Sequence, residues 1–336
     1  MRPPTVVPPG ASSGPGLLGR SAAATGMALA VLAGAAAAAP QTSPEAQAAS
    51  VVDVARTVRV DPTRCTTPSP DPAVTVVCTV DQVAAHLIDR SAVVLSGARH
   101  RGALDLRGRT TVSVRGETGA VLDAAGARFA LSLRDVADVT VTDLVLTGGT
   151  VQTVWVERTR EVALERVVVQ GSAGSGVQVR DSAGFRLTAS RVQDAASAGV
   201  MELTGVTDSR YAGLVVTRNG RGAAQYDGDG LQLSGTRVSV EDVVTTDNGS
   251  SALYEHGIYV SSAARDVRLV GVRSSGNAGV ALKLGGSGTL EGSVLVDDRI
   301  ALYCGVTAGA GWTVRTTSLT APRRSVAEQG CALATV

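Results

Sequence analysis

Three short stretches between Tyr226 and Lys283 hold most of the residues in this chain that could transfer protons or bind an anion. They read Tyr-Asp-Gly-Asp-Gly from Tyr226, Tyr-Glu-His-Gly-Ile-Tyr from Tyr254, and Val-Ala-Leu-Lys ending at Lys283. Together they contain one of the three histidines, the single lysine and three of the five tyrosines. If the protein has an active site, we expect it in this region.

Four of these residues predict acid–base chemistry on an acidic substrate. Lys283 stands alone among 30 arginines, and a lysine ammonium can bind a carboxylate or act as a base, which arginine cannot readily do. His256 is a candidate general base, with Asp229 to orient its ring and Tyr259 as a proton donor. An ordinary surface lysine and a histidine that only fills a turn are the alternatives.

Asp227 and Asp229 alternate with glycine in one loop and allow two further kinds of chemistry. They could bind Ca²⁺ that bridges to a uronate carboxylate, or act as the acid and base of a glycoside hydrolase. The hydrolase would need a third carboxylate such as Glu255 or Glu202. Asp-Gly-Asp-Gly is also ordinary turn chemistry. We expect no required cofactor, with Ca²⁺ as the candidate metal.

The elements that must position these residues are short strands in a repeat. Strand starts led by glycine recur at Gly176, Gly199, Gly230, Gly257 and Gly279, spaced 23, 31, 27 and 22 residues apart. Most turns carry a second or third short alternating strand. This pattern predicts an all-β, single-stranded right-handed parallel β-helix, in which stacked turns bury a common core.

Aligning the five glycines predicts which side chains share the outer face of one sheet, since stacked strands lie about 4.8 Å apart. Asp229 and His256 become stacked neighbours, and Lys283 follows Ser261 one turn on. Ala281 is expected to face outward next to Tyr259. A bulge is expected to turn Glu202 outward. Towards the N-terminal side the same face predicts substrate-binding residues at Trp155, Gln178, Arg180 and Gln232.

The two longest spacings place insertions at residues 219–229 and 248–256, which both end just before the same strand. Both are therefore expected at one edge of one sheet. Loops on a rigid scaffold often carry function, although tolerated surface insertions are also common.

The repeat over roughly residues 80 to 320 resembles the pectate-lyase-like superfamily of parallel β-helix proteins, which are built from PbH1 repeats. Tyr226-Asp-Gly-Asp229, His256-Gly-Ile-Tyr-Val260 and Gly279-Val-Ala-Leu-Lys-Leu284 are similar to the corresponding stretches of mannuronan C5-epimerases. In those enzymes a tyrosine and an Asp-Pro-His-Asp motif precede a turn that contains His-Gly-Ile. Gly228 stands where the family has its motif histidine and the proline is absent, so His256 would have to substitute.

Composition and charge limit the class of protein. The 39 glycines, abundant valine and alanine and only two phenylalanines favour many short strands. Residues 21–39 form an apolar run behind Arg2 and Arg20, which is typical of a signal peptide. A membrane anchor is the alternative. Without those two arginines, 29 basic residues stand against 30 acidic ones, which argues against a nucleic-acid partner.

These features predict the domain organisation. We expect a signal peptide over residues 1–39, cleaved between 36 and 49, and a linker over 40–60. A β-helix domain over 61–336 would include an N-terminal cap (61–100) and a C-terminal cap (300–336). A short capping helix is expected over 79–90, with His86 and His100 on the surface.

The four cysteines lie as two pairs near the ends of the chain, as is common in exported proteins. Of the three possible connectivities we expect the local one, Cys65 with Cys78 and Cys304 with Cys331. A zinc site is the runner-up. We therefore expect a secreted, monomeric protein that acts on a uronate-containing polysaccharide, as a lyase or C5-epimerase that begins by removing the C5 proton. In this reaction Lys283 or Arg180 would neutralise the carboxylate, His256 or Tyr259 would abstract the proton, and Tyr226 would protonate. The alternatives are a glycoside hydrolase that uses Asp227 and Asp229, and a non-catalytic glycan-binding protein.

Overall fold

The computed structural model describes residues 54–67, 69–222, 228–250, 255–296, 300–305, 311–320, 324–327 and 331–333. The expected signal peptide, the first part of the expected linker, and the candidate residues Tyr226 and Asp227 lie outside these ranges. Within them, no helix is both long and apolar enough to cross a bilayer.

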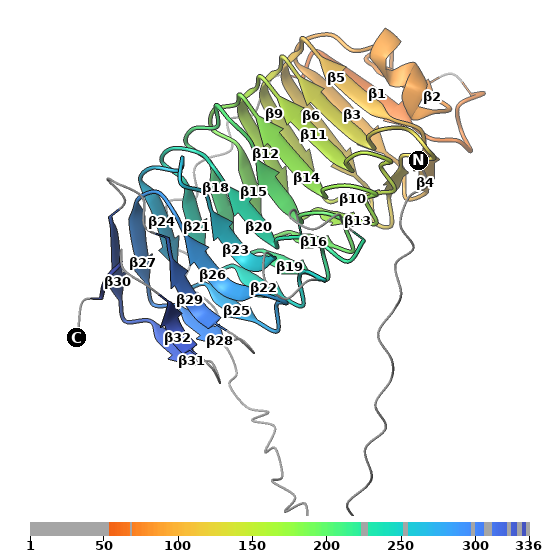
Figure 1. The fold of residues 1–336 in the computed structure, drawn as a ribbon. Helices are drawn as coiled ribbons and strands as arrows, with labels where there is room; N and C mark the ends of the chain where they lie inside the picture. Colours follow the sequence, from red (N-terminus) through yellow and green to blue (C-terminus); the bar gives the residue numbers. More distant parts are fainter. Residues whose placement is uncertain are drawn as a thin grey trace, which may run out of the picture. The chain divides into compact units, whose positions relative to one another are not determined.

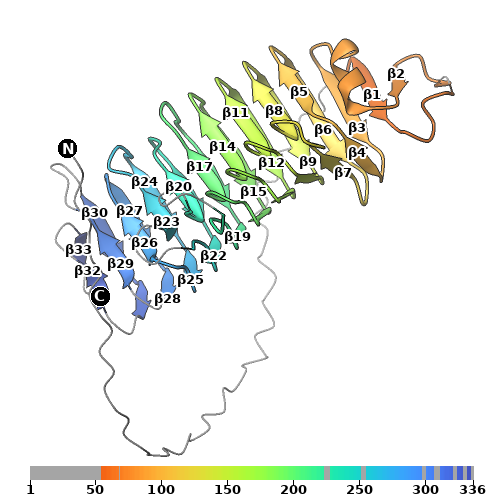
Figure 2. The same cartoon turned by 45° about the vertical axis from the view of Figure 1, so that its right-hand side comes forward.

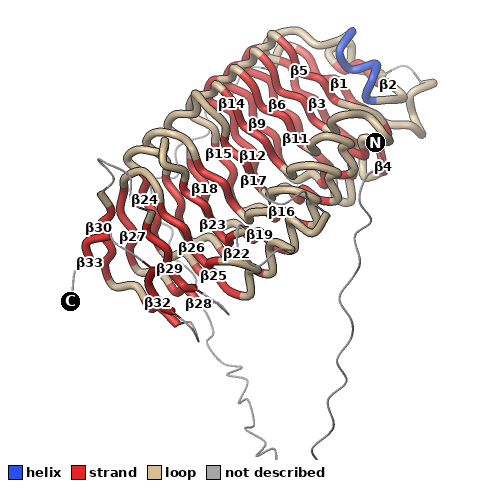
Figure 3. The backbone as a smooth tube through the Cα atoms, viewed as in Figure 1, coloured by secondary structure: helices blue, strands red, loops and turns tan. Residues whose placement is uncertain are grey.

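The described strands form three parallel sheets of 13, 10 and 10 strands, which we call sheets A, B and C (Figure 1). Each full turn of the chain contributes one strand to each sheet, and each strand pairs with its equivalents one turn before and one turn after. The tube drawing shows how turns and loops connect the strands at the corners (Figure 3). The fold is the predicted all-β, right-handed parallel β-helix.

The strand bounds follow the sheets. Sheet A contains, in order, β2 (Val74–Val77), β1 (Arg56–Val60), β3 (Ser91–Leu95), β6 (Thr110–Gly116), β9 (Ala137–Thr142), β12 (Arg160–Glu165), β15 (Arg186–Thr188), β18 (Arg210–Ala212), β21 (Ser239–Glu241), β24 (Val267–Val270), β27 (Gly288–Glu291), β30 (Trp312–Arg315) and β33 (Cys331–Leu333). Sheet B contains β4 (Arg99–Arg101), β7 (Val121–Asp123), β10 (Val145–Thr147), β13 (Val168–Gln170), β16 (Arg191–Gln193), β19 (Val215–Thr217), β22 (Val244–Thr246), β25 (Arg273–Ser275), β28 (Val294–Val296) and β31 (Ser318–Thr320). Sheet C contains β5 (Leu104–Arg107), β8 (Leu131–Arg134), β11 (Val154–Glu157), β14 (Val177–Arg180), β17 (Val200–Glu202), β20 (Leu231–Leu233), β23 (His256–Val260), β26 (Val280–Leu284), β29 (Ile300–Cys304) and β32 (Arg324–Ala327).

Alternation along each strand sends one set of side chains into the core. In sheet C, Val156, Val179, Leu233 and Val260 occupy one stacked interior position and have no exposed surface. Full burial of such a side chain contributes about 1.5–3 kcal/mol, so the stacked turns stabilise one another.

Glu202 occupies that same interior position, so the expected outward bulge is wrong. It is fully buried and accepts hydrogen bonds from the side chains of Ser209 and Tyr211 and from the backbone nitrogens of Ser234 and Gly235. Burial raises the pKa of the Glu202 carboxyl. The four donors explain why a carboxyl can replace an aliphatic side chain here.

Three asparagines spaced 29 residues apart form a buried ladder where the chain leaves sheet B: Asn219, Asn248 and Asn277. The amide of Asn219 donates to Asn248 at 3.0 Å, and that of Asn248 donates to Asn277 at 3.0 Å. Asn219 and Asn248 are the first residues of the two predicted insertions. Both insertions therefore begin from a fixed ladder and end just before β20 and β23 at the same edge of sheet C, as predicted.

The ends of the β-helix differ in part from expectation. The capping helix is a 3₁₀ helix, η1 (Val80–Ala85), shorter than predicted. His100 was expected on the surface but is buried in β4, where its Nε2 lies 2.9 Å from the carbonyl oxygen of Ser96. Residues 56–60, assigned to the linker, form β1. After residue 300 the repeat continues through β29 to β33 instead of decaying into a cap.

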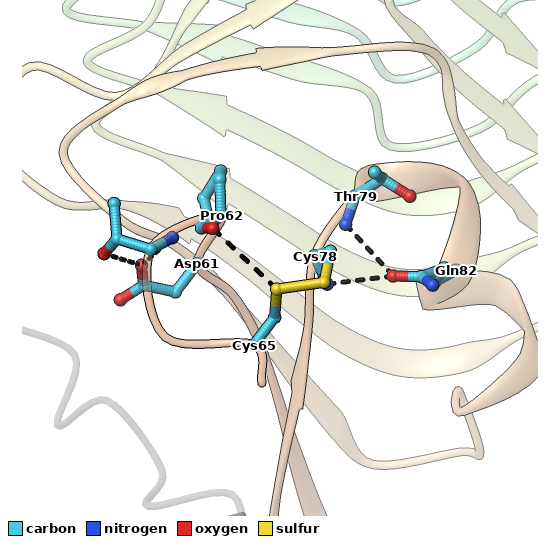
Figure 4. Close-up of a disulfide and its surroundings, with 7 residues drawn as sticks. Asp61, Pro62, Cys65, Cys78, Thr79 and Gln82 are labelled. Carbon is cyan, nitrogen blue, oxygen red and sulfur yellow. Dashed lines mark hydrogen bonds between the residues drawn. A yellow bond between two sulfur atoms is a disulfide. The ribbon is translucent and has the colours of Figure 1, made fainter. Parts of the chain in front are cut away.

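Both expected disulfides are present. Cys65 and Cys78 are joined at the N-terminal cap, close to η1 (Figure 4). Cys304 and Cys331 link β29 to β33 across the last turns. The predicted local pairing is confirmed at both ends.

Candidate functional site

One row of outward side chains runs along sheet C, whose strands lie side by side in Figure 2. We call it the outer column; its members are Trp155, Gln178, Met201, Gln232, Tyr259, Lys283 and Tyr303. The predicted binding residues Trp155, Gln178 and Gln232 thus share one row with the predicted catalytic residues Tyr259 and Lys283.

The register of the last turns differs from the predicted one by two residues. Tyr259 pairs directly with Lys283, and Ile258 pairs with Leu282. Ala281, expected to face outward, is fully buried. A shift of two residues preserves the alternation of inward and outward side chains, so the hydrophobic pattern could not distinguish the two registers.

The register brings three side chains together around Tyr259. The Nζ atom of Lys283 lies 5.0 Å from the centroid of the Tyr259 ring and 5.8 Å from that of Tyr303. On the other side, the His256 ring is 5.9 Å from the Tyr259 ring at an interplanar angle of 57°. Tyr259 and Lys283 are partly exposed, so this cluster presents an ammonium and a phenol at the surface.

His256 is held in its neutral form. His256 is only 2% exposed. Burial, together with the nearby charge of Lys283, lowers the pKa of its imidazole from 6.5 to about 3. Its Nδ1 atom is buried without a hydrogen-bond partner. A neutral imidazole with an unpaired nitrogen can accept a proton or a hydrogen bond.

Asp229 supports His256 through the backbone. Its Oδ1 accepts a hydrogen bond from the His256 backbone nitrogen at 2.7 Å, and the residue is 2% exposed. The two residues are neighbours on adjacent turns, as predicted, but this bond fixes the start of β23 and does not orient the imidazole ring. Burial first, and the charge of Asp229 second, raise the pKa of the Tyr259 hydroxyl. Tyr259 therefore retains its proton at neutral pH.

Glycine before each strand allows this close stacking. A Cβ atom on Gly230 would lie 2.4 Å from the carbonyl oxygen of Gly257, and one on Gly257 would lie 2.2 Å from the hydroxyl of Ser274. Neither position has room for a side chain.

Other predicted site residues lie elsewhere. Arg180 pairs with Asp181 at 3.0 Å and belongs to β14, three turns before the strand of Tyr259. Glu202 and Glu255 have no exposed surface. Tyr226 and Asp227 lie outside the described residues. In the part of the chain that the structure describes, no group of three or more His, Cys, Asp or Glu could hold a metal ion.

Sequence reasoning missed Tyr303, Met201 and the asparagine ladder. Tyr303 follows Lys283 by 20 residues, which is close to the basic repeat and could have signalled its place in the outer column. The equal spacing of the three asparagines was a second available signal.

Comparisons with known proteins identify the fold. No protein-family model matches the chain, and no curated protein matches its sequence. An alginate lyase from Paenibacillus sp. str. FPU-7 superposes with a TM-score of 0.54 and 14% identity, covering 83% of this chain and 99% of that chain. Tailspike protein 2 of Escherichia coli O157:H7 bacteriophage CAB120 gives a TM-score of 0.54 and 10% identity, covering 76% of this chain and 42% of that chain.

A GH136 lacto-N-biosidase from Eubacterium ramulus gives a TM-score of 0.50 and 9% identity, covering 82% of this chain and 68% of that chain. Of the tailspike protein, by contrast, this chain covers 42%, which is less than half of its length. At these identities the likeness shows only the fold, a parallel β-helix, so any chemistry must be inferred from the residues themselves.

Proposed function

We propose that this β-helix protein is secreted and acts on a uronate-containing polysaccharide, starting with removal of the proton at C5 of a uronate. The observation that supports this most is the contact of Lys283 with Tyr259 on two adjacent turns of the outer column, with the buried ring of His256 next to Tyr259. Two disulfides fit an oxidising compartment. Several proteins with this fold are named for their action on polysaccharides or glycans.

In this proposal Lys283 binds and neutralises the uronate carboxylate, which makes the C5 proton more acidic. Lys283 is the cation of the outer column. Arg180 is not a member of this column, and its guanidinium is paired with Asp181. Because an ammonium held between two tyrosine rings is partly shielded from water, its attraction for a carboxylate is stronger than in bulk solvent.

His256 is the proposed base. The anionic carboxylate offsets the charge of Lys283, which is one of the two causes of the low His256 pKa, so substrate binding makes the imidazole more basic. His256 is 2% exposed, and the proposal therefore requires the side chains over it to part when the substrate binds.

Tyr259 is the proposed acid, because its raised pKa keeps the hydroxyl protonated. In a lyase, His256 takes the C5 proton, the C5 electrons form the C4–C5 double bond as the C4–O bond breaks, and the leaving oxygen takes the hydroxyl proton of Tyr259. In an epimerase, C5 is protonated again from the opposite face. Both reactions share the first step and the same three residues.

The test is turnover of alginate, pectate and glycosaminoglycans. Ultraviolet absorbance detects the unsaturated uronates that a lyase forms, and NMR spectra detect the change of C5 configuration that an epimerase causes. The proposal predicts one of these two products on at least one uronate polymer. Release of reducing ends from neutral glycans, with no change in any uronate polymer, would instead support a hydrolase.

A further inference from the structure

An open cleft of about 370 Å³ lies N-terminal to the Lys283 cluster, between the turns that lead into β11, β14 and β17 and the two outer-column residues Gln178 and Met201 of sheet C. Its polar lining consists of the amides of Gln152 and Gln178 and the hydroxyls of Thr150, Ser175 and Ser197, with Met201 at one side. None of the residues that line it carries a charge. A volume of this size falls in the range of small-molecule sites.

The cleft lies in line with the cluster. Gln178 and Met201 are members of the outer column, and Tyr259 lies two turns beyond Met201. With turns about 4.8 Å apart, that separation is about 10 Å, which a short oligosaccharide spans. One continuous glycan chain could therefore occupy both places.

An aromatic surface lies next to the cleft, beginning on the turn that also supplies Gln152. Trp155 pairs with Gln178 in the sheet and stacks on Phe129, with ring centroids 5.8 Å apart and planes 19° from parallel. Both rings are partly exposed. A flat aromatic face of this kind suits the C–H face of a sugar ring.

The polar groups of the cleft suit an uncharged ligand. The Gln152 amide donates to Gln178 Oε1, and each amide keeps a further donor or acceptor for a ligand. Gln178 is 8% exposed, so its amide is already largely desolvated and rigid. A carboxylate in this cleft would lose water without gaining a cation, which is costly.

We propose that the cleft binds an uncharged sugar, a hexose or an N-acetylhexosamine, of the same chain whose uronate occupies the Lys283 cluster. This inference rests on the proposed function for the uronate and adds that the substrate is a mixed glycan. The neutral amides then select the uncharged unit, while Lys283 selects the acidic one.

The test is binding of four tetrasaccharides: glucose-only, N-acetylglucosamine-only, uronate-only, and alternating uronate and N-acetylhexosamine. Titration calorimetry gives the affinity, and Trp155 fluorescence reports contact with the cleft, because the other tryptophan, Trp312, is buried in sheet A. We expect the alternating tetrasaccharide to bind at least tenfold more tightly than the uronate-only one, with a change in fluorescence.

Gln178→Leu should weaken the alternating ligand at least tenfold. The matched control is Gln193→Leu, because Gln193 donates to Gln170 at 3.2 Å in the same stacked geometry on sheet B; it should leave binding unchanged. If Gln178→Leu does not fold, Trp155→Ala should weaken binding similarly. Uronate-only binding as tight as that of the alternating ligand, or equal effects of the two glutamine variants, would overturn the proposal.

The two proposals fail separately. Lys283→Met should leave binding of the uncharged tetrasaccharide that occupies the cleft unchanged while it weakens the alternating one. A protein that binds uncharged sugar through Gln178 but changes no uronate polymer would refute the proposed reaction and support the cleft. A protein that turns over uronate polymers but has no affinity for either uncharged tetrasaccharide would support the proposed reaction and refute the sugar-binding cleft.

Discussion

Replacing His256 by glutamine should change how the stability of the protein depends on pH. Glutamine is of similar size and cannot be protonated in this range. The imidazole has a pKa of 6.5 in the unfolded chain and about 3 in the folded protein, mainly because of burial and then because of Lys283. This difference corresponds to about 5 kcal/mol, as an order of magnitude for a buried group.

The sign follows from proton uptake. Above pH 6.5 the imidazole is neutral in both the folded and the unfolded protein, so its titration does not change the free energy of unfolding. As the pH falls below 6.5, the unfolded chain binds a proton that the folded protein does not, so the wild-type protein loses stability until about pH 3. The His256→Gln variant lacks this loss, and its stability relative to the wild type should rise by up to about 1.4 kcal/mol per pH unit.

The assay is urea unfolding of both proteins at a series of pH values between 7 and 3.5, followed by circular dichroism. Using the difference between the two proteins cancels the other titrating groups, including Glu202 and the paired surface carboxylates. An NMR titration of the imidazole gives the pKa directly, and Lys283→Met should raise it while leaving it below 6.5. Parallel pH profiles, or a wild-type imidazole that titrates near 6.5, would refute the reasoning.

Two further predictions concern the scaffold. Asn248→Ala removes four side-chain hydrogen bonds from the buried ladder and should lower the free energy of unfolding by about 3 kcal/mol; a loss below 1 kcal/mol in urea unfolding would contradict a structural ladder. Glu202→Leu restores the aliphatic residue found at the equivalent position of neighbouring turns, yet it should destabilise the protein by about 2–4 kcal/mol, because it leaves four buried donors unpaired. Equal or greater stability of this variant in the same assay would show that packing outweighs the polar network.

The repeat predicted the fold because the alternation of small apolar residues and the recurring glycines carry the period of each turn. The same signals located the two insertions and the stacking of Asp229 on His256. They did not fix the register beyond Gly257, because Ala281 and not Gly279 occupies the position equivalent to Gly257, and a shift of two residues preserves the alternation.

The sequence pattern could not predict which polar residues are buried, for a different reason. Glu202 follows a strand start and is polar, which favours exposure in any single segment. Its burial depends on Ser209, Tyr211 and two backbone nitrogens of the next turn. Such partners are separated in sequence and meet only when the turns stack. His100 differs, because the carbonyl oxygen next to its ring belongs to Ser96, only four residues earlier in the chain.

In the proposed reaction Lys283 binds the uronate carboxylate and His256 removes the C5 proton, and exchange of that proton with solvent D₂O measures this step. Purified wild-type protein is incubated with the uronate polymer on which it is most active, and deuterium at C5, or unsaturated product, is measured by NMR. Lys283→Met and His256→Gln should each reduce the rate at least a hundredfold, while Gln193→Leu on sheet B should not change it. Unchanged rates in the Lys283 and His256 variants would contradict the account.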